Sequence, residues 1–215
     1  MSANPNRIQK QIDERNKLWK KATKRQKAVL VAKDVIERID AKQLRANTGV
    51  WLEFSNTSSY SQNSPLQECI LGGESCTGCA MGGLMMSTIA YRNEVTSDSL
   101  YGHQLDEESS NFNLSEVFTD NQLELIEQAF EGGHGKYDFE FDSFNRHNLS
   151  DGDVPYPDEY LAKYWITKYR KACKSAHDKR IMRILSFYKR YQDEDNRRLK
   201  LIMQNIIKNK GLFVI

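Results

Sequence analysis

Apolar residues recur mostly at helical spacing along the chain, and only a few short stretches alternate between apolar and polar positions. Helical spacing predicts helices at residues 27–42, 120–131 and 197–209. A run of small and apolar residues predicts a further, buried helix within residues 76–92, with Cys76 and Cys79 at its entrance. Small side chains in this run would let another backbone approach the helix closely.

An aromatic and β-branched run and a charged amino-terminal segment add two more elements. Residues 50–54 (VWLEF) follow turn-forming residues and predict one short strand. Residues 1–26 predict a basic helical arm, on which four apolar residues lie on one face: Ile8, Ile12, Leu18 and Trp19.

The pattern as a whole predicts a predominantly helical α+β fold with a small sheet. We expect a single compact domain at residues 27–215, preceded by the arm at 1–26. Residues 134–176 break the compact pattern and predict an insertion that includes an acidic loop or ribbon. Within the core, we expect Ile126, Ile202 and Ile206 to be buried.

Length and composition agree with one folded domain. The chain has 215 residues, of which 39% are hydrophobic and 28% charged, so a core can form under a heavily ionised surface. No apolar stretch approaches the roughly 18 residues that a membrane span needs. We therefore expect a soluble, cytoplasmic protein without membrane contact.

The overall charge of +2 conceals a strong segregation along the chain. Residues 1–45 carry a net charge of +8, residues 46–160 carry −17 and residues 161–215 carry +11. The basic ends can fold against the acidic middle, they can bind an acidic partner, or the acidic middle can bind a basic partner. The sequence leaves these three explanations open.

The cysteines give a weak metal signal. Cys76 and Cys79 are two residues apart, but no second pair or nearby histidine completes a zinc site. Burial in the core explains both residues better, so we expect neither a metal nor another cofactor.

An enzyme is the third functional alternative, and its candidate residues lie in the insertion. His134 and His147 are close in sequence to the carboxylates of Asp138 and Glu140, which is the donor chemistry of a metal- or ligand-dependent enzyme. No neighbouring residue is placed to orient either histidine, and the chain contains no phosphate loop, G-x-S-x-G or H-E-x-x-H motif. We therefore assign no catalytic residue.

Aromatic and basic residues are interleaved between residues 160 and 191, which is typical of binding hot spots and of nucleic-acid contacts. The candidates for partner binding are Tyr164, Trp165, Tyr169, Arg170 and Tyr188, with Asp138 and Glu140 facing a basic partner. The basic amino-terminal arm is the next candidate surface.

Five stretches together resemble small uncharacterised proteins of bacteriophages and mobile elements. They are AKDVI (32–36), NTGVW (47–51), CTGCAMG (76–82), QLELIEQAFE (122–131) and MQNIIKNKGLF (203–213). The resemblance implies an accessory protein that works in the cytoplasm of a bacterial host cell, where it binds a host or defence protein stoichiometrically and inhibits or modulates it. The alternatives are a nucleic-acid-binding protein that uses the basic terminal helices, and the enzyme based on His134 and His147.

Overall fold

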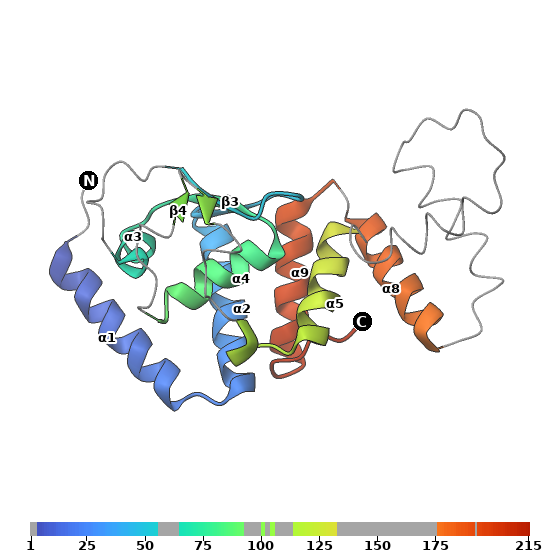
Figure 1. Ribbon diagram of the computed structural model, residues 1–215, viewed down its shortest axis with the longest axis horizontal. Helices are drawn as coiled ribbons and strands as arrows, with labels where there is room; N and C mark the ends of the chain where they lie inside the picture. Colours follow the sequence, from blue (N-terminus) through green and yellow to red (C-terminus); the bar gives the residue numbers. More distant parts are fainter. Residues whose placement is uncertain are drawn as a thin grey trace.

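The computed structural model (Figure 1) describes residues 4–55, 65–92, 100–101, 104–105, 114–132, 176–191 and 193–215. Its helices are α1 (Pro5–Lys21), α2 (Lys24–Asp40), α3 (Leu66–Leu71), α4 (Ala80–Ile89), α5 (Asp120–Glu131), α8 (Ala176–Arg190) and α9 (Asp195–Lys208), with the short 3-10 helix η3 (Leu114–Glu116). The fold is α+β and predominantly helical, as the sequence predicts.

Five short strands form one sheet in the described part of the chain, in the order β1-β3-β2-β5-β4. They are β1 (Leu44–Ala46), β2 (Leu52–Phe54), β3 (Cys76–Gly78), β4 (Leu100–Tyr101) and β5 (Gln104–Leu105). Only β1 and β3 pair in parallel, with Leu44 opposite Cys76, and the other pairs are antiparallel. Of these strands, the sequence predicted β2 alone.

The buried helix begins later than the sequence predicts. Cys76 lies in β3, and Cys79 is the N-cap residue of α4, so the helical prediction for residues 76–78 is wrong. The reason is tertiary, because β3 fills the position between β1 and β2 and its backbone bonds to both. All ten residues of α4 are buried, which confirms a central helix.

Helix α4 packs closely against the sheet, because its backbone approaches that of the residue before β2. A Cβ atom added at Gly82 would overlap the backbone carbonyl oxygen of Trp51, at the start of β2. Only glycine leaves room for that contact. The expected role of the small residues in this helix is thereby confirmed.

Two helices from opposite ends of the sequence, α2 and α9, pack side by side in the centre of the molecule (Figure 1). They run antiparallel, because Lys200 near the start of α9 pairs with Asp40 at the end of α2 (2.6 Å), while Gly211 after α9 lies against Arg25 at the start of α2. Ile202 and Ile206 of α9 and Ile126 of α5 are fully buried, as expected.

The amino-terminal segment forms a helix whose apolar face is narrower than expected. Asn4 caps α1 by accepting a hydrogen bond from Asn6 N, and Pro5 occupies the first helical position. Ile12 and Trp19 are buried, but Leu18 is 54% exposed, so its placement on the same face is wrong. Thr23 and Gln26 then form a capping box, which starts α2 three residues earlier than the sequence predicts.

Candidate binding groove

The fold brings the two basic ends of the sequence together. Helices α1 and α2 belong to the first end and α9 to the second, and α2 packs against α9. The ion pair between Lys27 and Glu116 (3.3 Å) joins a basic end to the acidic middle. Other pairs lie within the ends, such as Lys200 with Asp40 and Arg198 with Asp195. Acidic residues of the basic ends themselves therefore neutralise part of the basic charge in the described part of the structure.

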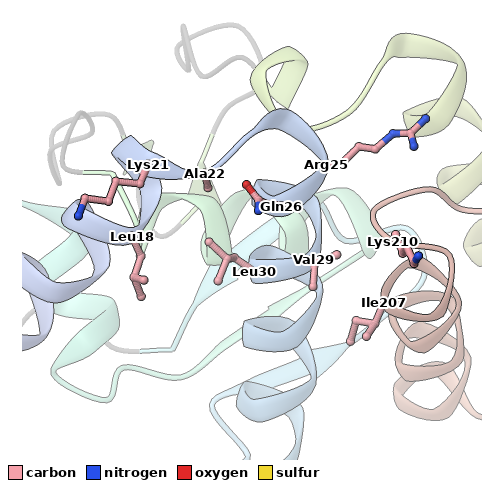
Figure 2. A pocket seen from close by; sticks show the side chains of 9 residues that line it. All are labelled: Leu18, Lys21, Ala22, Arg25, Gln26, Val29, Leu30, Ile207 and Lys210. Atoms are coloured by element: carbon pink, nitrogen blue, oxygen red, sulfur yellow. The ribbon is translucent and has the colours of Figure 1, made fainter.

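A groove of about 650 Å³ opens where these basic helices meet (Figure 2). Nine residues line it: Leu18, Lys21 and Ala22 of α1 and the turn after it, Arg25, Gln26, Val29 and Leu30 of α2, and Ile207 and Lys210 of α9 and its end. The floor is aliphatic, with Leu18 the most exposed large apolar side chain that the structure describes. Such a surface, apolar and bordered by charge, is typical of a binding site.

The rim of the groove is positively charged. Lys21, Arg25 and Lys210 are exposed, and none of the three side chains has an ion-pair or hydrogen-bond partner among the described residues. Of the lining residues that the structure describes, none is acidic. The rim therefore presents cations that can pair with an acidic ligand.

The turn after α9 holds Lys210 at this rim. Lys210 has a φ of 53°, and its N–H donates to Ile207 O (3.1 Å) while the N–H of Gly211 donates to Ile206 O (2.8 Å). This is a Schellman motif with lysine where glycine is usual. Gly211 has a φ of 92°, and a Cβ there would overlap the backbone of Arg25, so the turn is closely packed on the start of α2.

Buried charge fixes α1, and with it one wall of the groove. The Asp34 carboxylate of α2 is 2% exposed and pairs with Nη1 of Arg15 (2.7 Å) and Nε of Arg38 (2.6 Å). The Arg15 guanidinium lies 4.6 Å from the centroid of the Tyr91 ring, which stacks on Trp19 at 5.7 Å. These contacts orient α1 so that Leu18 faces the groove.

A second buried arginine joins α9 to the loop that follows β1. The Arg198 guanidinium donates to Tyr191 O (2.7 Å), to Thr48 Oγ1 (2.8 Å) and to Asp195 Oδ1 (2.7 Å). Asp195 Oδ2 also accepts from the N–H (3.0 Å) and the hydroxyl (3.1 Å) of Thr48. Since Arg198 is 0% exposed, this cluster is part of the packing that joins α9 to the loop.

One of the aromatic residues predicted to bind a partner contributes to this cluster. Tyr188 of α8 is half-buried, and its ring lies 4.8 Å from the Arg198 guanidinium. A Cβ at Gly132, the residue that ends α5, would meet the same ring at 2.5 Å. Tyr188 therefore packs between α5 and α9. The other candidates, Tyr164, Trp165, Tyr169, Arg170, Asp138 and Glu140, lie outside the described residues, as do His134 and His147.

The cysteine pair lies in the core, as the burial interpretation predicts. Cys69, Cys76 and Cys79 are free and buried. Burial raises the pKa of the Cys76 thiol to about 12 and that of Cys79 to about 11, so both are protonated at neutral pH, whereas metals bind the thiolate. Among the residues described, no three His, Cys, Asp or Glu side chains are grouped to hold a metal ion.

We expect these three thiols to resist modification in the folded protein. In a Cys173→Ser variant at pH 7.5, an aromatic disulfide reagent should label well under about 0.1 thiol per chain within minutes, because burial withholds both access and the thiolate. In denaturant, all three should react. Rapid labelling of even one thiol without denaturant would contradict the assignment of these cysteines to the core. A zinc content near one atom per chain in the purified protein would support a metal site instead.

Sequence reasoning missed the groove because its parts are far apart along the chain. The available signal in the sequence was Leu18, an apolar residue within a lysine-rich helix. Helical spacing alone assigned it to the apolar face of the arm, but in the structure it is exposed. Ile207 and Lys210 join it only through the antiparallel packing of α2 and α9.

Taken together, the fold and the groove define a mainly helical α+β protein with a cationic, apolar surface groove. No protein-family model, curated protein or solved structure matches the chain. Of the helices that the structure describes, none has the length and apolar character needed to cross a membrane.

Proposed function

We propose that the protein acts by stoichiometric, non-catalytic binding to a partner protein, which it inhibits or modulates. The groove between α1, α2 and α9 carries this proposal, because it combines an aliphatic floor with cations that have no charge partner among the described residues, and both are parts of an interface. The resemblance to proteins of bacteriophages and mobile elements directs the choice of partner to a host or defence protein in a bacterial cytoplasm.

Nucleic-acid binding is the second candidate, and the convergence of the two basic ends favours it. The lining of the groove argues against it as the function of this surface. Bases bind by stacking on aromatic rings, whereas Leu18, Val29, Leu30 and Ile207 are aliphatic and none of the described lining residues is aromatic. The enzyme based on His134 and His147 remains a prediction from the sequence.

Affinity capture from a nuclease-treated bacterial lysate tests the proposed function. We expect one protein to be retained by the tagged chain, and native mass spectrometry of the reconstituted complex to give a fixed stoichiometry. Titration of generic DNA and RNA at several salt concentrations is the comparison. Retention that nuclease abolishes, together with nucleic-acid affinity that falls roughly 10³-fold between 50 and 200 mM salt, would favour the second candidate instead.

A further inference from the structure

We infer that the groove binds an acidic amphipathic helix of the partner protein. This inference rests on the proposed function and adds the chemistry of the occupant. It follows from three properties of the groove: the charge of its rim, the character of its floor and the shape that its helices give it.

The rim selects an acidic occupant. Lys21, Arg25 and Lys210 come from three different segments, and all three lack a charge partner in the described structure. The nearby Lys27 is already engaged, because it pairs with Glu116 and lies 4.8 Å from the Trp19 ring centroid. Three cations around one groove repel each other at low salt, and carboxylates from a partner would relieve that repulsion.

The floor selects apolar anchors. Leu18, Val29, Leu30 and Ile207 remain partly or fully exposed, although the neighbouring Ala28 and Val31 of α2 are completely buried. Covering these four side chains removes apolar area from water, which favours association. A highly charged acidic chain without apolar residues would leave this surface uncovered.

The walls favour a helical occupant. Side chains on the floor and rim follow helical spacing, with Leu18 and Lys21 three residues apart on α1 and Arg25 and Val29 four apart on α2. A groove between helices accepts the ridge formed by residues i, i+3, i+4 and i+7 of another helix. A membrane surface would fit an apolar face that protrudes, whereas this apolar face is concave.

An unbiased selection identifies the occupant by its chemistry. Displayed random peptides of about 16 residues, enough for four helical turns, are selected on the full-length protein and depleted on a Lys21→Glu, Arg25→Glu variant. We expect enriched peptides to combine Asp and Glu with apolar residues at i, i+3, i+4 and i+7. Enrichment of peptides without that pattern, or of none, would overturn the inference.

Two matched pairs of variants then localise the binding of the best selected peptide by fluorescence anisotropy. Lys21→Glu with Arg25→Glu should weaken it by at least about tenfold, because rim charges control electrostatic association. Lys20→Glu with Lys24→Glu changes the same charge on the same helices but at residues outside the groove lining, and should change affinity less than about twofold.

The second pair compares the two lysines that have positive φ. Lys210→Gly removes the rim charge while keeping the left-handed turn, and should weaken peptide binding severalfold. Lys42, with a φ of 58° after α2, has the same local geometry but does not line the groove. Lys42→Gly should therefore leave binding unchanged, and equal effects of the two variants would contradict the inference.

The outcomes separate this inference from the proposed function. If a partner protein binds at fixed stoichiometry but ignores Lys21→Glu with Arg25→Glu, the binding function stands and the groove assignment is wrong. If acidic peptides bind the groove and no partner protein is retained, the proposed function fails alone. Groove-dependent binding of phosphatidylserine vesicles or single-stranded DNA, but not of peptide, would identify a different occupant and overturn the inference.

Discussion

Replacing Gly82 with alanine is expected to destabilise the protein by more than about 3 kcal/mol, at or above the upper end of the usual cost of overpacking. The new Cβ would overlap the backbone carbonyl oxygen of Trp51, and it would lie 3.2 Å from Leu52 Cβ. Neither neighbour is the flexible end of a long side chain. The alanine can be accommodated only if α4 and β2 move apart, which disrupts packing in the centre of the core.

The adjacent glycine supplies the control. A Cβ at Gly83 would lie 3.2 Å from Leu44 Cδ2 and 3.5 Å from Leu199 Cδ2, which are side-chain ends that can rotate. Alanine also favours the helix by about 1 kcal/mol over glycine, so we expect Gly83→Ala to change stability by less than about 1 kcal/mol. Urea unfolding followed by circular dichroism measures both variants. Equal unfolding midpoints would show that α4 and β2 are not in this contact.

The helices could be predicted from sequence where a periodic apolar face is long and ends at a recognisable cap. Helix α9 carries the full stripe, and α5 ends at Gly132, which has a φ of 78°. Strands β1 and β3 could not be predicted. Each has three residues, and they form a parallel pair although Leu44 and its partner Cys76 are 32 positions apart in the sequence, so long-range pairing determines both.

The candidate groove could not be predicted from the sequence either, because it too depends on contacts between distant parts of the chain. Leu18 and Ile207 lie near opposite ends of the chain, and only the packing of α2 on α9 brings them to one surface. The sequence did show that both ends are basic, which is the property that gives the groove its rim. Whether a given lysine is paired depends on three-dimensional neighbours: Lys27 has Glu116, whereas Lys21 has no such partner among the residues described.

The second large effect is expected from Arg198→Met, which should lower the free energy of unfolding by about 3 kcal/mol. This is the lower end of the usual cost of removing one partner of a buried ion pair, because Arg198 is 0% exposed but Asp195 is 24% exposed. The substitution leaves the carboxylate of Asp195 without this cation and removes the guanidinium donor from Thr48 Oγ1, while Tyr191 O still accepts from the N–H of Glu194 (3.1 Å). It also removes the guanidinium that lies 4.7 Å from the Phe130 ring centroid and 4.8 Å from that of Tyr188. Methionine fills part of the volume but replaces none of these polar contacts.

Arg197 is the matched control, because it is the preceding residue on the same helix but points to solvent and pairs with the exposed Glu194 at 3.0 Å. Arg197→Met should leave the midpoint of urea unfolding unchanged, since exposed ion pairs contribute little to stability. A third variant, Arg198→Lys, distinguishes charge from geometry. The ammonium group of lysine cannot span the three acceptors of the planar guanidinium, so we expect it to recover only part of the lost stability. Recovery to the wild-type midpoint would show that positive charge alone holds α9 to the loop at Thr48.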